Sequence, residues 1–357
     1  MRAIDFFCGA GGLTRGLLDS GIDVVAGFDA NPHCRQTYEK NNLSAPFFEQ
    51  DICDVSPAKI WKILGSRRTS DLLVVGCAPC QPFSKQRKRA ASGLHCAFGE
   101  VDPDATLLGA FARLVEAILP GQVLIENVPG IAKVKGLSTY RRFLRMLRLN
   151  SYDIAEGVLD AKSFGVAQTR RRCVVIATRG RKASLPNRLF GPGLQAYATV
   201  RRAMMHFPPI VAGESHPRVP NHVAAVISEK NLERLRSTPH DGGDRRSWPR
   251  ELELECHKGG YQGHSDVYGR MAWDSPAPTL TGRCNSLSNG RYGHPCQDRA
   301  ISLREAASLQ SFPDAYIFYG LNQQIARQIG NAVPVRFAEV LGRHIQCLRE
   351  PRRSDLG

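Results

Sequence analysis

The chain lacks several features that would place it in whole classes of protein. No apolar run approaches the ~18–20 residues that a membrane-spanning helix needs. The first residues enter a strand-like run directly, which is not the pattern of a secretory signal peptide. Eleven cysteines are scattered along 357 residues without the spacing of a disulfide framework. We therefore expect a cytoplasmic protein with reduced thiols.

Acidic residues are scarce relative to basic ones. The chain has 48 Lys and Arg against 33 Asp and Glu, which gives a formal net charge of +15 and a sequence pI near 9.6. Such an excess attracts polyanions through long-range steering and counterion release, and it favours nucleic acid as a partner. The cations are dispersed and form no evident basic amphipathic helix, which argues against a membrane surface.

Short β-rich runs alternate with helical patterns in the first half of the chain. This alternation predicts an α/β fold with a parallel sheet flanked by helices, and two later runs extend the sheet. After about residue 180, Gly, Pro, Ser, Arg and His predominate and predict loops and short strands, with no internal repeat. Strand-like runs are 3–7, 22–28, 46–52, 71–76, 122–128, 151–161 and 171–178, and helical patterns are 11–21, 31–41, 104–119, 303–312 and 322–345.

The first strand–helix turn reads "DFFCGAGG" (5–12). Its glycines let the backbone approach a ligand at a helix N-terminus, although Thr14 replaces the third glycine of a strict dinucleotide motif. Asp29 lies 20 residues beyond Gly9, where a carboxylate is placed to accept hydrogen bonds from ribose hydroxyls. Asp51 ends the third strand-like run and is placed to meet an adenine amino group. Together they predict an adenosine-containing ligand, either a dinucleotide or S-adenosylmethionine.

Two cysteines lie two residues apart in "GCAPCQPFSKQRKR" (76–89). A redox pair would use both sulfurs, but Cys77 lies at a strand end while Cys80 begins the following loop. A zinc site would need a second ligand pair at finger-like spacing, and the downstream Cys and His residues do not supply one, so we expect no metal. A single nucleophilic cysteine, Cys80, fits best because the cations after it favour the thiolate.

With these segments and several later ones, the chain resembles the bacterial type of the C5-cytosine-specific DNA methyltransferase family. The resemblance covers nearly the whole length, and its motifs occur in the order and at the separations typical of the family. The motifs are "DFFCGAGGLTRG" (5–16), Asp29, "DI" (51–52), "PCQPFS" (79–84), "ENV" (126–128), "QTRRR" (168–172), "SLREAASLQSFPD" (302–314) and "QIGNAVPV" (328–335).

The resemblance implies a Rossmann-like S-adenosylmethionine-dependent methyltransferase sheet with a second, smaller, irregular target-recognition domain. Residues 1–180 would form the catalytic domain, 185–315 the recognition domain, and 320–347 a C-terminal helix that returns to the catalytic domain. Arg, Asn, Gln and His are frequent between 185 and 300. These residue types read base edges in the major groove, or they hold phosphates and cap turns, so the target sequence stays open.

The resemblance also assigns roles residue by residue. Cys80 matches the nucleophile, Glu126 the carboxyl group that faces the N3/N4 edge of cytosine, and Arg170 and Arg172 the arginines that flank the reacting base. Positions matching the cofactor pocket are Phe7, Gly9, Ala10, Gly11, Gly12, Asp29, Asp51, Ile52, Leu107 and Asn331. Positions matching substrate contacts are Pro79, Gln81, Ser84 and Gln168.

The implied activity is methyl transfer from S-adenosylmethionine to C5 of cytosine in a short, specific duplex DNA sequence. It would proceed through a covalent Cys80–C6 intermediate on a flipped-out base. We expect a monomer that acts on nucleoid DNA in the cytoplasm, with a cognate restriction endonuclease as a further partner and no membrane partner. Three alternatives stay open: a tRNA-methylating relative, a catalytically silent DNA-binding homologue, and a nicotinamide-dependent oxidoreductase, in which Cys80 and Glu126 would have no role.

Overall fold

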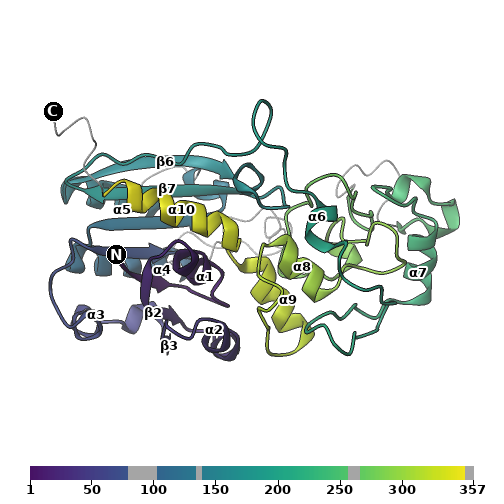
Figure 1. The fold of residues 1–357 in the computed structure, drawn as a ribbon, viewed down its shortest axis with the longest axis horizontal. Coiled ribbons are helices and arrows are strands. Elements are labelled where there is room, and N and C mark those ends of the chain that lie inside the picture. Colours follow the sequence, from purple (N-terminus) through teal and green to yellow (C-terminus); the bar gives the residue numbers. More distant parts are fainter. Residues whose placement is uncertain (79–102, 134–138, 256–265, 350–357) are drawn as a thin grey trace. The chain divides into compact units, whose positions relative to one another are not determined.

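The chain forms two compact units in the computed structural model, which describes residues 1–78, 103–133, 139–255 and 266–349 (Figure 1). Unit 1 comprises Met1–Asp160, Arg171–Asn187 and the chain from Phe337 onward. Unit 2 comprises Ala161–Arg170 and Arg188–Arg336. The chain therefore passes between the units at four points, and unit 1 is assembled from three separate segments.

A seven-stranded sheet with the order β3-β2-β1-β4-β5-β7-β6 forms the centre of unit 1. The first five strands pair in parallel, which confirms the expected alternation of strands and helices. The last strand, β7, is antiparallel to both β5 and β6, an orientation that alternation alone does not reveal. The strands are β1 Arg2–Phe6, β2 Asp23–Asp29, β3 Phe47–Glu49, β4 Leu72–Gly76, β5 Gln122–Asn127, β6 Tyr152–Asp160 and β7 Arg171–Arg179.

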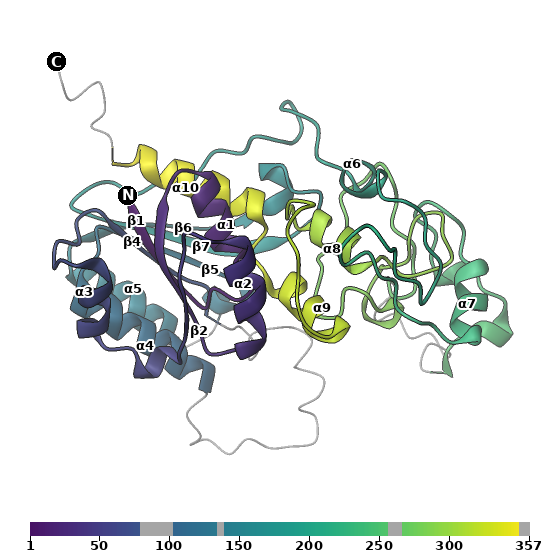
Figure 2. The same cartoon turned by 60° about the horizontal axis from the view of Figure 1, so that its bottom comes forward.

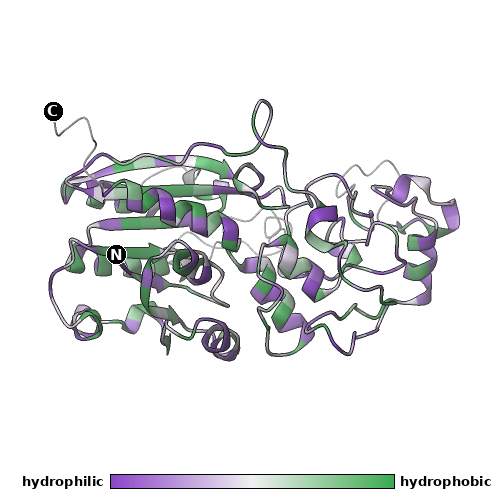
Figure 3. Cartoon of the chain, in the orientation of Figure 1, coloured by the Kyte–Doolittle hydropathy of each residue, from purple (hydrophilic) through white to green (hydrophobic). Residues whose placement is uncertain are grey.

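Helices cover both faces of this sheet (Figure 2). On one face, α3, α4 and α5 pack against every second residue of the strands, such as Ile4 and Phe6 of β1. On the other face, the amide of Gln122 donates to the carbonyl of Ile345 in α10 at 3.0 Å. Burial on both faces explains why the strands are nearly continuous apolar runs, which Figure 3 shows in green. The helices are α1 Gly12–Asp19, α2 Arg35–Asn41, α3 Pro57–Leu64, α4 Pro103–Ile118, α5 Thr139–Leu149 and α10 Val335–Cys347.

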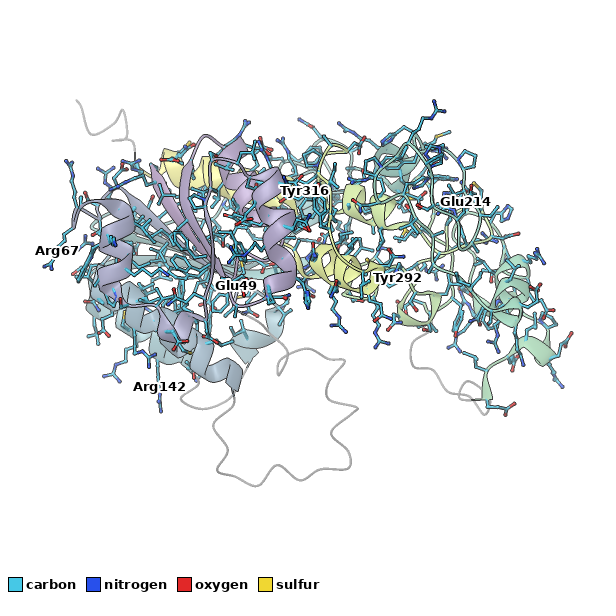
Figure 4. All side chains as sticks on the ribbon, turned by 90° about the horizontal axis from the view of Figure 1, so that it is seen from below. Glu49, Arg67, Arg142, Glu214, Tyr292 and Tyr316 are labelled. Carbon is cyan, nitrogen blue, oxygen red and sulfur yellow. The ribbon has the colours of Figure 1, made fainter. Side chains whose placement is uncertain are left out.

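Helix α5 corrects one expectation, because it is a basic amphipathic helix. Its apolar positions, among them Tyr140 and Phe143, are buried in the core of unit 1. Its exposed positions include four arginines, of which Arg142 extends outward in Figure 4. The apolar face is already covered by protein, so only the charged face is presented to the surroundings. No helix in the described part of the chain is long and apolar enough to cross a membrane.

Unit 2 consists mainly of loops, as the composition after residue 180 predicts. Outside its helices, the described residues of this unit pair only through isolated β-bridges. The helical patterns expected near the end of the chain are confirmed, since α8 and α9 lie within them and α10 follows. The helices of unit 2 are α6 Val200–Met204, α7 Glu229–Arg236, α8 Leu303–Leu309 and α9 Asn322–Asn331.

Buried arginines hold these loops together. Arg270, Arg299 and Arg304 are fully buried. Arg299 donates to both carboxylate oxygens of Glu305 at 2.7 Å, and the Glu305 carboxylate in turn accepts from the backbone N–H of Ser302 to close a capping box on α8. Buried charges are stable only when they are paired and hydrogen-bonded, as here. These three arginines are therefore structural.

Candidate active site

The carboxyl ends of β1, β2, β4 and β5 meet at one edge of the sheet, and most predicted site residues of unit 1 follow these strands. The glycine turn comes directly after β1. Phe7, Gly9 and Gly11 have φ values of 62°, 52° and 86°, a left-handed region that favours glycine. A Cβ built on Gly9 would meet no heavy atom within 4 Å among the described residues. Backbone is thus presented to an open space where α1 begins, with Ala10 and Gly12 buried beneath it.

Asp29 ties this turn to the end of β2. Its Oδ2 accepts the backbone N–H of Gly9 and its Oδ1 that of Asn31, both at 2.8 Å. Burial raises the pKa of the half-buried carboxyl group, while the two N–H donors oppose that shift. Each oxygen keeps a further lone pair, so the carboxylate is fixed relative to the turn and still able to accept hydrogen bonds.

The remaining positions predicted to bind a cofactor are divided between the two units. Asp51 is exposed after β3, and its Oδ1 accepts the N–H of Cys53 at 2.8 Å to cap a short 3₁₀ turn. Ile52, the first residue of that turn, is buried in the core, and Leu107 of α4 packs against the same core. In unit 1, the exposed carboxyl group of Asp51 therefore lies next in sequence to Ile52, and Ile52 and Leu107 belong to the same apolar core. Asn331 is the exposed last residue of α9 and belongs to unit 2.

Sequence reasoning assigned no role to Asp5, which the structure buries completely within β1. Thr14 Oγ1 donates to Asp5 Oδ2 at 2.7 Å and also lies 3.1 Å from the Tyr38 hydroxyl. No described residue donates to Asp5 Oδ1. Burial raises the pKa of Asp5 to about 7. The available signal was a single acid inside the apolar run "AIDFF".

Replacing Asp5 with asparagine should remove part of the pH dependence of folding stability. The raised pKa keeps Asp5 protonated in the folded state between about pH 4 and 7, where the unfolded chain is ionised, so its contribution to stability falls as pH rises through that window. Between pH 5 and pH 8, wild type should lose on the order of 2 kcal/mol relative to Asp5→Asn. Urea unfolding at both pH values measures this difference. Asp54→Asn, at an exposed position, should track wild type, and parallel curves for Asp5→Asn would contradict the assignment.

Glu126 and Arg172 are brought together at the ends of adjacent strands. Glu126 lies near the end of β5 and is 7% exposed. Arg172 lies at the start of β7, with its Nε 2.9 Å from Glu126 Oε1. The two charges form an ion pair, but the Nε–H of Arg172 is not aligned for a hydrogen bond to Glu126 Oε1. The carboxyl group therefore keeps the capacity to accept a hydrogen bond from a ligand.

Asn127, the next residue of the "ENV" motif, is a second residue that the sequence reasoning missed. Its Nδ2 donates to the carbonyl of Ala78 at 3.1 Å, and its Oδ1 accepts the N–H of Val128 at 2.8 Å. Ala78 stands two positions before Cys80, so Asn127 holds the chain where it leaves β4. The predicted nucleophile itself, Cys80, lies outside the described residues together with Pro79, Gln81 and Ser84.

Gln168 and Arg170 belong to unit 2, where both are buried. The Gln168 amide donates to Gln310 Oε1 at 2.9 Å and accepts the N–H of Leu280 at 3.0 Å. Arg170 donates to the carbonyls of Leu280 and Ala332, each at 3.0 Å. The structure thus shows contacts of these two side chains with unit 2 itself. In the described ranges, no group of three His, Cys, Asp or Glu side chains is placed to hold a metal ion.

A model of the C-5 cytosine-specific DNA methylase family matches residues 1–347. The chain belongs to this family. The methylase is 37% identical over 353 residues to the type II methylase M.HgiDII of Herpetosiphon aurantiacus, a match that covers 97% of this chain and 95% of the relative. It is 31% identical over 339 residues to the type II methyltransferase M1.HphI of Haemophilus parahaemolyticus, covering 95% and 84%.

The fold of the methylase is also similar to that of a solved structure. A crystal structure of a prophage-encoded DNA modification methyltransferase of E. coli superimposes with a TM-score of 0.74 and 22% identity, covering 98% of this chain and 99% of that one. This likeness supports the Rossmann-like methyltransferase fold. The family and the curated relatives identify the methylase as a DNA cytosine-5-methyltransferase, an enzyme type that depends on S-adenosylmethionine.

Proposed function

We propose that the methylase transfers a methyl group from S-adenosylmethionine to C5 of cytosine within a short, specific duplex DNA sequence, through a transient bond between Cys80 Sγ and C6 of a flipped-out base. The observation that carries the proposal is the buried Glu126–Arg172 pair at the sheet edge where the Gly9–Asp29 turn also lies. At this end of the sheet, the Gly9–Asp29 turn suits a nucleoside ligand. The Glu126–Arg172 pair suits the polar atoms of a nucleobase.

The residues of unit 1 fit the cofactor. The space at Gly9 admits a ligand, and Asp5 Oδ1 beneath the turn has no hydrogen-bond partner among the described residues. Asp29 would accept hydrogen bonds from the ribose hydroxyls and Asp51 from the adenine amino group. Phe7, Gly9, Ala10, Gly11, Gly12, Ile52 and Leu107 would line the pocket, and unit 2 would add Asn331. When bound, S-adenosylmethionine supplies the methyl group on a positively charged sulfur.

Cys80 would activate the target ring, because C5 of cytosine is a poor nucleophile. As the thiolate bonds to C6, the electron pair of the C5–C6 double bond moves toward C5 and the N3/O2 side of the ring. Glu126 would share a proton at N3, and Arg172 would hold a fixed positive charge near O2, where exclusion of water strengthens its effect. Once C5 carries the methyl group, a base removes the C5 proton and the thiolate leaves, which restores the double bond.

The target cytosine must rotate out of the double helix for this chemistry, since its reacting atoms are inaccessible in a stacked base pair. Pro79, Gln81, Ser84, Gln168 and Arg170 are the residues that we propose position the flipped base and the strand around it. The net charge of +15 supports binding of the phosphate backbone by the enzyme as a whole.

Replacing Asp29 with asparagine should weaken S-adenosylmethionine binding roughly 10- to 100-fold, because a charged acceptor for the ribose hydroxyls is lost. Asp23→Asn, at the exposed start of the same strand, is the matched control and should leave the dissociation constant unchanged. Isothermal titration calorimetry gives both constants directly. Equal affinities for wild type and Asp29→Asn would remove Asp29 from the ribose site.

The type II relatives support duplex DNA as the substrate and a cognate restriction endonuclease that cuts the same site as a partner. We propose that the methylase acts as a monomer on nucleoid DNA in the cytoplasm. Bisulfite sequencing of plasmid from cells that express it should show 5-methylcytosine at one short recurring sequence. Cells expressing Cys80→Ala are the control. Unmodified plasmid together with methylated tRNA would favour the tRNA-methylating alternative.

A further inference from the structure

The opposite edge of the unit 1 sheet, where β1, β4 and β5 begin and β7 ends, contains a pocket of about 620 Å³. Five arginines line it, together with backbone and hydroxyl groups of neighbouring loops. They come from distant parts of the sequence, so this concentration reflects the fold and not a local basic run. The arginines are Arg2, Arg68, Arg179, Arg181 and Arg349.

The pocket contains far more positive than negative charge. Among the described residues that line it, Asp71 is the only acidic one, so five guanidinium groups face one carboxylate there. Arg349 forms an ion pair with Asp71, so the negative charge of that carboxylate is already balanced. Arg181 donates to the carbonyl of Arg349, and Arg2 donates to the carbonyl of Leu64 at 2.7 Å, but neither contact supplies negative charge. The excess positive charge is therefore not balanced by the lining residues that the structure describes.

Two of these arginines, Arg68 and Arg179, have guanidinium groups that make no hydrogen bond or ion pair with another described residue. Arg179 lies near the Tyr152 phenol, which is neutral and does not balance its charge. The neighbouring Arg67 differs, because its guanidinium stacks 4.5 Å above the Trp61 ring and extends outward from unit 1 (Figure 4). Like charges gathered without partners repel one another, which a bound anion would reverse.

We propose that this pocket binds a phosphate-bearing anion. Guanidinium forks match phosphate oxygens with paired hydrogen bonds, which makes arginine the preferred residue for this group. The volume exceeds that of one phosphate and suits several linked phosphates. Their source is either a free polyphosphate or nucleotide, or the backbone of a nucleic acid. The pocket lies at the amino ends of the parallel strands, away from Gly9, Asp29 and Glu126, so this site does not depend on the proposed reaction.

The test compares two double variants of the full chain with equal changes of charge. Arg68→Gln with Arg179→Gln removes the two unpartnered groups, and Arg113→Gln with Arg142→Gln removes two exposed arginines of α4 and α5 outside the pocket. With tripolyphosphate as the probe, calorimetry should show saturable binding to wild type at fixed ionic strength. The pocket variant should bind at least tenfold more weakly, and the control variant within twofold of wild type.

A second arm distinguishes the source of the phosphates. A labelled dA·dT duplex, which offers no cytosine, is titrated into the same proteins over a range of salt concentrations. If the backbone is the ligand, the pocket variant should bind the duplex more weakly, with a salt dependence reduced by about two phosphate contacts. If tripolyphosphate alone distinguishes the variants, a free polyphosphate or nucleotide is the source.

The proposal is wrong if wild type binds neither probe beyond a chloride control, or if both double variants respond alike to both probes. Unchanged binding of S-adenosylmethionine by the pocket variant would show that any loss is local to this edge of the sheet.

Discussion

Replacing Cys80 with alanine should abolish methyl transfer to DNA while leaving the fold and the binding of S-adenosylmethionine intact. The proposed reaction needs a sulfur that bonds to C6, and the family motif "PCQPFS" (79–84) assigns that part to Cys80. Cys77 lies three positions earlier, but desolvation by the surrounding protein raises the pKa of its thiol well above the usual range. A thiol held in its neutral form is a weak nucleophile.

Cys77→Ala is therefore the matched control and should retain activity. Transfer of labelled methyl groups to DNA measures turnover, and DNA that contains 5-fluorocytosine should trap a covalent adduct with wild type and Cys77→Ala only. Substantial methylation by Cys80→Ala, or an adduct formed by that variant, would show that another residue is the nucleophile.

Replacing Glu126 with glutamine should lower turnover by roughly 10²–10⁴-fold, the range expected when a proton-sharing group is lost. The amide preserves the size of the side chain but carries no charge to pair with Arg172. Both side chains are largely buried, and breaking such a pair by removing one partner costs up to about 3–5 kcal/mol. We therefore expect lower stability along with lower turnover.

Single-turnover rates at saturating cofactor and DNA separate these two effects, since they count only folded, loaded enzyme. Glu116→Gln, at an exposed position of α4, is the matched control and should match wild type in rate and in urea unfolding. A rate for Glu126→Gln within tenfold of wild type would leave Glu126 with a structural role only.

The parts of the fold that depend on local patterns could be predicted from the sequence. The five parallel strands and their helices are periodic apolar segments, and the glycine turn with Asp29 follows from spacing along two consecutive strands. The antiparallel direction of β7 could not be predicted, because strand patterns carry no sign of direction. The amphipathic helix α5 is also not among the predicted elements, because its four arginines interrupt the apolar positions within a short segment.

Polar residues were hardest to interpret, because one residue type serves opposite purposes in different surroundings. Arg270 and Arg299 lie in the segment 185–300, where the composition predicts arginines that either read bases or hold phosphates and cap turns, yet both are buried and hold carbonyl or carboxylate oxygens. Gln168 and Arg170 stand beside Arg172 in one motif, but they contact unit 2 while Arg172 pairs with Glu126. Burial and partners decide these roles, and both are properties of the folded chain.

The position of α10 has a consequence for how the enzyme is made. The strands that this helix covers are all synthesised within the first half of the chain, but the helix itself emerges only after the entire loop-rich unit. Until then the part of the nascent sheet that α10 covers stays exposed and prone to aggregation. A ribosome that stops early would therefore release an incomplete, vulnerable product, and unit 1 would be completed only in molecules that already carry all of unit 2.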